Sequence, residues 1–314
     1  MKVIIPVAGK GTRVRPHSYS KAKSFLKLAG KTVIEYLIDH LSTLNPEEYI
    51  IITDPIYNKD YKTFLETKYP NYKFSFPIQE MPLGPGHVIL QAKDLIKKDD
   101  DIFILFSDTI FVKDLSCINH LKKESDAVIF AKEVEDYQRF GVIVHNNKHI
   151  TKFVEKPSTP ISKLAAIGAY YVKNGKDLIK YIEKLIKLDI MINGEYFLTD
   201  AFVLMMQDNK TLLVEEVDDW FDTGKIETIL ATHQKILKGS IWKGNNLQIK
   251  NSIIGKNISL GNNTQIINCN IENSIIGENT ILQGLTIKDS VIGDNVKIKK
   301  DGHSFNVGDD CYIQ

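Results

Sequence analysis

Continuous apolar runs alternate with amphipathic segments along the first three quarters of the chain. Apolar runs rich in β-branched and aromatic residues predict buried strands over residues 2–8, 48–53, 102–107, 126–132 and 165–172. Apolar residues spaced i, i+3, i+4 predict amphipathic helices over residues 33–44, 87–98 and 176–188. This alternation is typical of a doubly wound, mainly parallel, Rossmann-like α/β domain, in which ligands bind at the carboxyl ends of the strands.

The pattern changes after residue 238, where a seven-residue sequence is repeated. Residues 251–257 read NSIIGKN, residues 273–279 read NSIIGEN and residues 289–295 read DSVIGDN. An aliphatic residue followed by Gly, two polar residues and a small residue fits the hexapeptide rule of a parallel β-helix. In such a helix the aliphatic side chain fills the core, and Gly or Asn occupies a corner of positive φ.

We therefore predict two domains, a Rossmann-like domain over residues 1–238 and a short left-handed parallel β-helix over residues 245–314. Composition agrees, because twelve Asn lie between Asn245 and Gln314 whereas all ten Pro lie at or before Pro160. The copies begin 22 and 16 residues apart, so the coils are irregular, and about four of them fit the length. The alternative is a small β-sandwich with strong turns.

Composition also limits the class of partner. Charged residues make up 25% and hydrophobic residues 43% of the 314-residue chain, and a net charge of +1 gives no reason to expect nucleic acid or a membrane as partner. Eight Lys/Arg nevertheless precede Val33, and the first acidic residue is Glu35. Such a local cationic patch suggests a small polyanion. Three Cys without C-x-x-C spacing, and no long apolar run, predict a cytoplasmic protein with reduced thiols.

The cations gather in a glycine-containing loop after the first predicted strand, VAGKGTRVRPHSYSKAKSF at residues 7–25. Val14 stands where the dinucleotide pattern G-x-G-x-x-G needs a third glycine, and no Gly-Lys-Ser/Thr completes a Walker loop. What remains is a turn whose backbone N–H groups can approach phosphate oxygens, followed by Arg13 and, ten residues later, by Lys23. We expect a polyphosphate there; the alternative is a tight turn with a solvated basic surface.

The segment PVAGKGTRVRP, with a lysine ten residues beyond its arginine, resembles the signature of the sugar-1-phosphate nucleotidylyltransferases, also called NDP-sugar pyrophosphorylases. The resemblance covers residues 1 to about 238, and the short glycine spacing is similar to that of glucose-1-phosphate uridylyltransferases. It implies that Arg13 steadies the β and γ groups of a triphosphate while Lys23 reaches the α-phosphate and the sugar phosphate. The backbone that wraps the triphosphate is implied at Ala8, Gly9, Gly11 and Thr12.

Residues 79–92, QEMPLGPGHVILQA, resemble the nucleobase segment of the same family. The resemblance implies that Gln79 and the backbone near Gly84 read the edge of the base. A Gln amide offers both a donor and an acceptor to an imide such as uracil or thymine. Pro85 stands where the family often has threonine and removes an N–H beside the base, which leaves the choice of nucleotide open. The alternative is an ordinary loop with a Pro-Gly turn.

Two acidic residues are candidates for binding a metal. Asp108 follows the predicted strand at residues 102–107, and Mg²⁺ prefers one or two carboxylates together with phosphate oxygens. The W-x-D-x-G sequence at residues 220–224 resembles the second metal motif of the family and implies Asp222 as the other ligand. Ala22 before the lysine and Ser107 before Asp108 depart from the usual proline and glycine, but both departures leave the ligating groups intact.

Residues 153–172, FVEKPSTPISKLAAIGAYYV, resemble the sugar-phosphate pocket of the family. The resemblance implies that Glu155 accepts hydrogen bonds from sugar hydroxyls and that Lys156 holds the sugar phosphate. Gly141 and Gly168 match backbone positions that contact the sugar. Residues 194–201, GEYFLTDA, match a further segment near the sugar and make Asp200 a weaker candidate.

The resemblance implies a nucleotidyltransferase that condenses glucose 1-phosphate with UTP or dTTP in the presence of Mg²⁺, and a homo-oligomer that could assemble through the β-helix. Within the class, the alternative is a mannose-1-phosphate guanylyltransferase. From another class, the alternative is a catalytically silent regulatory protein that binds nucleotide sugars. Such a protein would have lost an acid or lysine of the metal and phosphate sites, yet Arg13, Lys23, Asp108 and Asp222 are all present. A bifunctional enzyme whose β-helix transfers acyl groups would have only His303 available there as a catalytic histidine. We therefore expect the β-helix to serve subunit contact or allostery.

Overall fold

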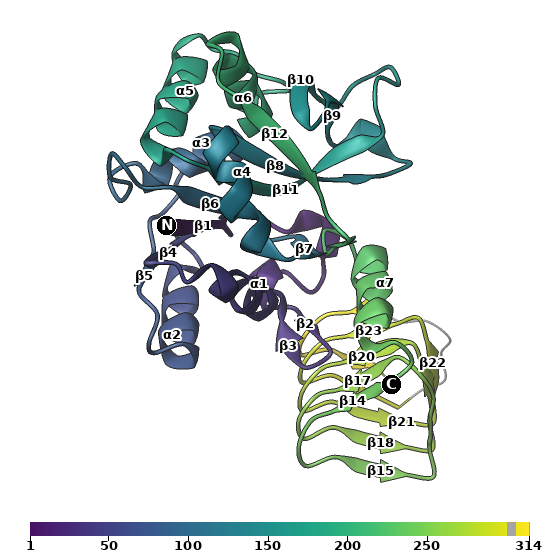
Figure 1. Cartoon of the computed structure of the whole chain (residues 1–314). Coiled ribbons are helices and arrows are strands. Elements are labelled where there is room, and N and C mark those ends of the chain that lie inside the picture. Colours follow the sequence, from purple (N-terminus) through teal and green to yellow (C-terminus); the bar gives the residue numbers. More distant parts are fainter. Residues whose placement is uncertain (300–305, 314) are drawn as a thin grey trace. The chain divides into compact units, whose positions relative to one another are not determined.

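The computed structural model describes residues 1–299 and 306–313, with the side chains of residues 312 and 313 left out. The chain divides into two compact units, both discontinuous in sequence (Figure 1). The first unit joins Met1–Gly9 to Leu37–Trp220, and the second joins Lys10–Tyr36 to Phe221–Gln314. The cation-rich segment near the N-terminus therefore belongs to the same unit as the C-terminal repeats.

A nine-stranded sheet forms the centre of the first unit, in the order β5-β4-β1-β6-β11-β8-β12-β10-β9. These strands are β5 (Phe74–Ser75), β4 (Glu48–Ile52), β1 (Lys2–Pro6), β6 (Ile102–Leu105), β11 (Leu164–Val172), β8 (Ala127–Glu133), β12 (Leu212–Glu216), β10 (His149–Glu155) and β9 (Gly141–Asn146). The pairs from β5 to β6, and the pair β8–β12, are parallel, whereas β11 runs antiparallel to both of its neighbours. The predicted strands are thus present, but the strand at residues 164–172 interrupts the parallel pairing.

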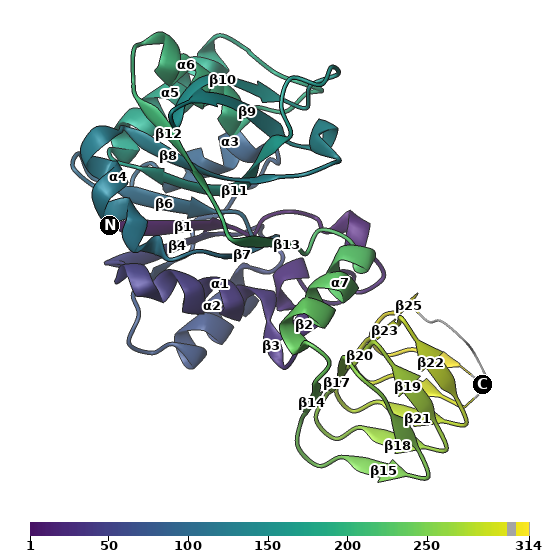
Figure 2. The ribbon, with the colours of Figure 1, turned by 45° about the vertical axis from the view of Figure 1, so that its right-hand side comes forward.

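Helices cover both faces of this sheet (Figure 2). The helices are α1 (Val33–Leu41), α2 (Asn58–Lys68), α3 (Pro85–Ile89), α4 (Ile118–Glu124), α5 (Gly175–Lys187) and α6 (Leu198–Gln207). Side chains of α3, α5 and α6 share a buried cluster with Ile4, Ile50 and Ile104, which lie side by side on neighbouring strands. On the other face, Tyr49 of β4 contacts α1, where its hydroxyl donates to the carbonyl oxygen of Ile38.

One predicted helix is shorter than its sequence pattern. Residues 87–98 have helical spacing, but α3 ends at Ile89 and is followed by a 3₁₀ turn, Leu90–Ala92. The Asp100 carboxylate accepts a hydrogen bond of 2.7 Å from the N–H of Lys97. Local bonds of this kind offer the backbone an alternative to the helix, and periodicity alone does not reveal them.

The C-terminal part of the second unit is a parallel β-helix, as predicted. One sheet contains β14 (Ile241–Lys243), β17 (Ile258–Leu260), β20 (Ser274–Ile276), β23 (Val291–Ile292) and β25 (Asn306–Val307). The second contains β15 (Gln248–Lys250), β18 (Gln265–Ile267), β21 (Ile281–Gln283), β24 (Lys297–Ile298) and β26 (Tyr312–Ile313), and the third β16 (Ile253–Ile254), β19 (Asn270–Glu272) and β22 (Thr286–Lys288). The described strands thus belong to five successive coils, one more than the length suggested, because residues 241–243 already pair as the first.

The corners of the β-helix use Asn and Gly for different reasons. Each of the three repeated heptapeptides begins and ends on a residue of positive φ, for example Asn273 (46°) and Asn279 (54°). The Gly of the repeats has no positive φ. A Cβ on Gly261 would instead lie 2.5 Å from the carbonyl carbon of Gly277 in the next coil. The prediction that Gly or Asn occupies a corner of positive φ is confirmed for Asn, and for Gly284 (73°) outside the repeats, whereas Gly within the repeats is needed for the close approach of stacked coils.

Three further elements of the second unit hold its N-terminal segment. A hairpin joins β2 (Lys27–Leu28) to β3 (Lys31–Thr32), and α7 (Ile226–Leu237) packs against β2. Gly30, at the turn of the hairpin, has a φ of 87°, and a Cβ there would collide with the indole of Trp242 from β14. The first coil of the β-helix is therefore packed directly on this hairpin. The strand β13 (Asp219–Asp222) precedes α7.

Candidate functional site

The chain leaves the sheet at the carboxyl end of β1, where the N–H of Val7 still donates to the carbonyl oxygen of Ile52 at 2.8 Å. Ala8 is half-buried against the apolar core and Gly9 is exposed. A Cβ on Gly9 would meet no atom within 4 Å, so the protein itself does not require glycine at this position. A glycine in open space allows a ligand to approach the backbone closely.

The cationic loop, residues 10–25, folds back on itself in the second unit. Gly11 has a φ of 59° and caps a 3₁₀ turn, Thr12–Val14. A Cβ on Gly11 would lie 3.1 Å from the Cβ of Ser18 and 3.2 Å from that of Lys23. Ser18 fixes this arrangement, because its hydroxyl donates to the carbonyl oxygen of Gly11 at 2.7 Å. The glycine turn and Lys23, twelve residues apart in sequence, are therefore in contact.

The two arginines of the cationic loop lie in different surroundings. Arg13 is exposed on the 3₁₀ turn, and the guanidinium of Arg15 lies 4.8 Å from the ring centroid of Tyr19. Lys23 begins a second 3₁₀ turn, Lys23–Phe25, which buried Ala22 precedes. Backbone donors and cationic side chains are thus combined in one short segment, which is the chemistry of an anion site.

In the first unit, Asp108 lies in the turn between β6 and β7 (Thr109–Val112). The N–H of Phe106 donates to the carbonyl oxygen of Gly168 at 2.9 Å, and Thr109 Oγ1 donates to that of Ile167 at 2.5 Å. Gly168 has a φ of 84°, and a Cβ there would lie 3.3 Å from Thr109 Oγ1. Gly168 was predicted to contact a sugar, and in the structure its backbone also holds the turn that carries Asp108.

Glu155 ends β10 and is held by two neighbours. Thr199, in the first turn of α6, donates a hydrogen bond of 2.5 Å to Glu155 Oε2. A Cβ on Gly141 would lie 2.9 Å from the same oxygen, so glycine at 141 leaves room for the carboxylate. Burial raises the pKa of Glu155, while the Thr199 hydroxyl and the Lys156 charge oppose that rise.

Lys156 is exposed, with its ammonium 4.4 Å from the ring centroid of Phe197. Its φ of 43° is unusual for a residue with a side chain, and its N–H donates to the carbonyl oxygen of Phe140 at 2.9 Å. The ring of Phe140 in turn contacts that of Trp220 edge-on at 5.2 Å. The backbone of Lys156 is therefore fixed by its neighbours, while its ammonium lies over an aromatic face.

Asp108 and Glu155 act on the same buried hydroxyl. Tyr170 of β11 is buried, and burial followed by the negative charges of Glu155 and Asp108 raises the pKa of its phenol. The charges of the predicted metal ligand and of the predicted sugar ligand in the first unit thus both affect Tyr170. Asp200, the weaker candidate, lies in the first turn of α6; burial raises its pKa, and its Oδ2 has no hydrogen-bond partner among the described residues.

The predicted base-reading segment has a defined geometry. The N–H of buried Gln79 donates to the carbonyl oxygen of Thr53 at 2.8 Å, and its Nε2 lies 3.3 Å from Nδ1 of His87. Gly84 has a φ of 108°, and a Cβ there would lie 2.7 Å from the backbone of Tyr196. Pro85 is the first residue of α3, where a missing N–H costs no helical hydrogen bond.

Asp222, in the second unit, ends β13 just before α7. Its Oδ1 accepts a hydrogen bond of 2.6 Å from the N–H of Gly224, and its carbonyl oxygen accepts one of 3.1 Å from Thr232. A Cβ on Gly224 would lie 2.7 Å from Asp222 Oδ1. The glycine of the W-x-D-x-G motif is thus required by the carboxylate two residues before it.

The described residues provide no cluster of side chains that would enclose a metal by themselves. No group of three or more His, Cys, Asp or Glu suited to a metal occurs in residues 1–299 and 306–313. Mg²⁺ typically takes one or two carboxylates and fills its remaining positions with water and substrate phosphates. Asp108 and Asp222 are the two carboxylates that the sequence indicates for this role, and each is described above within its own unit.

Several residues that shape the site carried no signal in the sequence. Thr199 and Tyr196 lie in the segment 194–201 that the resemblance did indicate, yet only Asp200 was selected there. Tyr170 lies in an apolar strand and looks like a core residue. Thr109 follows Asp108 directly, but its bond to Ile167 joins residues 58 positions apart. Contacts of this kind depend on the fold.

Comparison with known proteins identifies a matching family and similar proteins. The sequence model described as Nucleotidyl transferase matches residues 2–239. A "bifunctional sugar-1-phosphate nucleotidylyltransferase/acetyltransferase" from Sulfurisphaera tokodaii is 29% identical over 261 residues, which cover 81% of this chain and 61% of that protein. The "UTP–glucose-1-phosphate uridylyltransferase AglF" from Haloferax volcanii is 27% identical over 230 residues, 70% of this chain and 89% of that protein.

Solved structures agree with the sequence comparison. The structure of "UDP-glucose pyrophosphorylase" from Acinetobacter baumanii has a TM-score of 0.60 and 26% identity, and covers 75% of this chain and 93% of that one. The chain spans about three fifths of the length of the first relatives it matches, 61% for the Sulfurisphaera protein.

Residue His303, considered above for acyl transfer, lies outside the described residues. No helix in the described part of the chain is both long and apolar enough to cross a bilayer.

Proposed function

The chain belongs to the nucleotidyl transferase family, and we propose that it joins a sugar 1-phosphate to a nucleoside triphosphate and releases pyrophosphate. The contact between Gly11 and Lys23 is the observation that carries this proposal. It brings the base of the Lys23 side chain against the glycine turn, and backbone N–H groups of such a turn together with a cation are suited to phosphate. The relatives named as sugar-1-phosphate enzymes support the substrate class.

In the proposed reaction, an oxygen of the sugar phosphate attacks the α-phosphorus of the nucleotide in line. The bond from that phosphorus to the β-phosphate bridging oxygen breaks, and pyrophosphate leaves. The nucleophile is already anionic, so no side chain has to remove a proton. The protein must bring two anions together and neutralise the charge that separates them.

Each proposed role follows from the chemistry of the residue. Lys23 and Lys156 neutralise the two phosphates that react, and Arg13 holds the departing pyrophosphate, with the backbone at Ala8, Gly9, Gly11 and Thr12 around it. Bound through Asp108 and Asp222, Mg²⁺ would supply positive charge near the α-phosphate.

For the sugar, Glu155 accepts hydrogen bonds from the hydroxyls, and the narrow backbone at Gly141 and Gly168 allows close approach. The Thr199 hydrogen bond counteracts the effect of burial on Glu155 and so favours the ionised acceptor.

We further propose UTP or dTTP, with glucose 1-phosphate, as the substrates. Gln79 supports this choice, because its buried position and its contact with His87 fix an amide suited to an imide base. The backbone at Gly84 supports it as well, since its left-handed conformation turns the chain beside α3.

Pyrophosphate release tests both levels of the proposal. UTP, dTTP, GTP, ATP and CTP should each be combined with the 1-phosphates of glucose, galactose, mannose and N-acetylglucosamine, in the presence of Mg²⁺. We expect turnover with UTP or dTTP and glucose 1-phosphate. Equal rates with GTP and UTP would contradict the role of Gln79, and turnover with GTP and mannose 1-phosphate alone would identify the guanylyltransferase. Nucleotide-sugar binding without turnover in any combination would identify a regulatory protein.

A further inference from the structure

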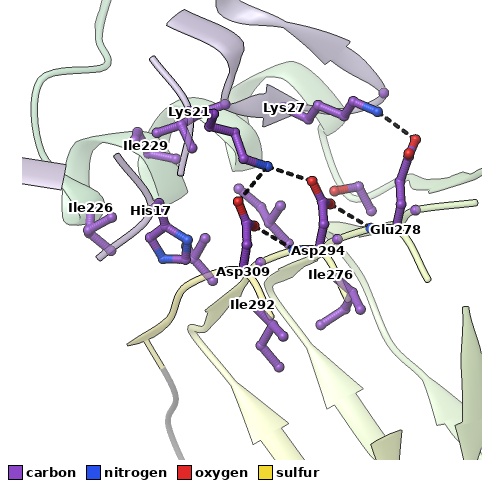
Figure 3. Close-up of a pocket in the computed structure, with 18 of the residues that line it drawn as sticks. His17, Lys21, Lys27, Ile226, Ile229, Ile276, Glu278, Ile292, Asp294 and Asp309 are labelled. Atoms are coloured by element: carbon purple, nitrogen blue, oxygen red, sulfur yellow. Dashed lines mark hydrogen bonds and ion pairs between the residues drawn. The ribbon is translucent and has the colours of Figure 1, made fainter. Parts of the chain in front are cut away.

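The cationic loop, residues 10–25, and the acidic corner of the β-helix are in direct contact. The corner is formed by the residue after Gly in successive coils, namely Glu278, Asp294 and Asp309. Figure 3 shows that the ammonium groups of Lys21 and Lys27 point toward these carboxylates. All of these residues belong to the second unit.

Lys21 makes two of these contacts. Its Nζ lies 2.5 Å from Asp294 Oδ2 and 3.1 Å from Asp309 Oδ2. Burial alone would lower the pKa of Lys21, but the two aspartates together raise it above its ordinary value. The structure thus pairs the charge of Lys21 within the protein.

Each aspartate uses its two oxygens differently. Asp309 Oδ1 accepts from the N–H of Asp294 at 2.7 Å, and Asp294 Oδ1 accepts from the N–H of Glu278 at 2.7 Å. These bonds close the corners of stacked coils. The Oδ2 atoms face the cationic loop, where Asp309 also accepts from the hydroxyl of Ser20. In each aspartate, one carboxylate oxygen thus accepts a bond within the β-helix and the other contacts the cationic loop.

The last described coil also makes uncharged contacts with the cationic loop. A Cβ on Gly308 would lie 3.2 Å from the Cβ of Pro16, and His17 Nε2 lies 2.7 Å from Asn306 Oδ1. His17 is buried, and so is the carboxylate of Asp309, with only 7% of its side chain exposed. The coil therefore fixes residues 16–21, which lie between Arg13 and Lys23 in sequence.

We propose that Asp294 and Asp309 are positioning residues for the cationic loop, holding Lys23 and Arg13 in place through Lys21, while Gly308 of the same coil packs against Pro16. This inference rests on the proposed function, because it takes the loop as the triphosphate site. Lys21 stands only two residues before Lys23, so a shift of its backbone is passed to the glycine turn that Lys23 contacts. In this proposal the β-helix forms part of the nucleotide site.

The test uses charge-removing variants of the full chain. Asp294→Asn combined with Asp309→Asn keeps an oxygen for each corner bond but places an amide near Lys21. Lys21→Met removes the cation at similar length, and Lys21→Arg restores it. Asp310→Asn is the matched control, because Asp310 lies in the same coil as Asp309 and its carboxylate accepts a hydrogen bond of 2.7 Å from Asn295.

Kinetics and hydrogen exchange should be measured on the same proteins. With the nucleotide that the release assay selects, we expect the KM for nucleotide to rise on the order of 10- to 100-fold in the double variant and in Lys21→Met. Lys21→Arg and Asp310→Asn should stay near the wild type. A merely structural role would lower kcat through a smaller active fraction and leave KM unchanged. Amide exchange over residues 10–25 should accelerate in the same two variants.

The two proposals fail in different ways. An unchanged KM and unchanged exchange over residues 10–25, in both the double variant and Lys21→Met, would overturn the positioning role. Absence of pyrophosphate release from the wild type would overturn the proposed function instead. In that case the exchange comparison alone decides whether the acidic corner orders the loop. Lys21→Met leaves every corner bond of the β-helix intact, so it serves even where the double variant does not fold.

Discussion

Thr199 donates a hydrogen bond of 2.5 Å to Glu155, from the first turn of α6 to the end of β10. The bond stabilises the ionised carboxylate, whereas burial favours the neutral acid and raises its pKa. Thr199→Val should therefore raise the pKa of Glu155 further, because it removes the hydrogen bond that favours the ionised form. The acid limb of kcat/KM for the sugar 1-phosphate should move to higher pH.

Thr151→Val is the control for this experiment. Thr151 is exposed on the same strand, where its hydroxyl donates to the carbonyl oxygen of Val144 at 3.1 Å. Its pH profile should match that of the wild type. A Thr199→Val profile that also matches the wild type would show that Glu155 does not need to be ionised for activity.

Gly168→Ala should impair catalysis as well as stability. A side chain at a φ of 84° is strained, and the new Cβ would lie 3.3 Å from Thr109 Oγ1 and 3.4 Å from the Cβ of Phe106, in the turn that carries Asp108. We expect a loss of about 1–2 kcal/mol of stability from the backbone, and a fall in kcat/KM on the order of 100-fold from displacement of Asp108.

Gly284→Ala separates the two effects. Gly284 has a φ of 73°, and a Cβ there would meet nothing within 4 Å. It should lose similar stability in chemical denaturation while keeping full activity. Equal activity losses in both variants would mean that strain alone, rather than the position of Asp108, explains the Gly168 result.

His233 makes stability depend on pH. It is fully buried in α7, and neither ring nitrogen has a hydrogen-bond partner in the described structure. Burial lowers its pKa from 6.5 to about 4. Between these values the unfolded chain binds a proton that the folded chain does not, so the free energy of unfolding falls as pH falls through this window. The total loss from His233 should be about 3 kcal/mol.

His233→Leu should remove this dependence. Urea unfolding at a series of pH values between 7 and 4 should give a flatter curve for the variant than for the wild type, with the largest difference near the acid end. His17, whose pKa is also lowered by burial, remains in both proteins, so the difference between the curves isolates His233. Parallel curves would mean that His233 is solvated or paired in solution.

Removing either charged group proposed for phosphate chemistry should abolish most turnover. Asp108→Asn and Lys23→Met should each lower the rate of pyrophosphate release by about 10²- to 10³-fold, since each removes a preorganised charge from the reacting phosphates. Thermal unfolding should stay close to that of the wild type. The controls Asp99→Asn and Lys62→Met make the same changes on exposed residues and should have no effect. Normal pyrophosphate release by either test variant would refute its role.

Much of the fold could be predicted because its signals are local. Continuous apolar runs gave the strands of the first unit, and a seven-residue repeat gave the β-helix. The direction of β11 could not be predicted, because an apolar run buried on both faces has the same composition in parallel and antiparallel pairing. The role of Gly within the repeats could not be predicted either, since it depends on the distance to the next coil.

The candidate site also has residues that the sequence indicates and partners that only the fold reveals. Arg13, Lys23, Asp108 and Glu155 stand in short motifs that can be read in order along the chain. Lys21 stands in the same motif, yet its partners Asp294 and Asp309 lie in the β-helix, 273 positions away in the first case. No pattern within the cationic loop distinguishes a lysine that faces a ligand from one that faces an aspartate. Only the fold supplies that information.

The long separation between Lys21 and Asp294 has a consequence for biosynthesis. The ribosome makes about 5–20 residues per second, so these two residues, 273 positions apart, are synthesised tens of seconds apart. The cationic loop is synthesised first, and the coils that bind it follow about 273 residues later. The order of synthesis therefore sets a minimum delay before the cationic loop can reach its final conformation, however quickly the Rossmann-like sheet folds.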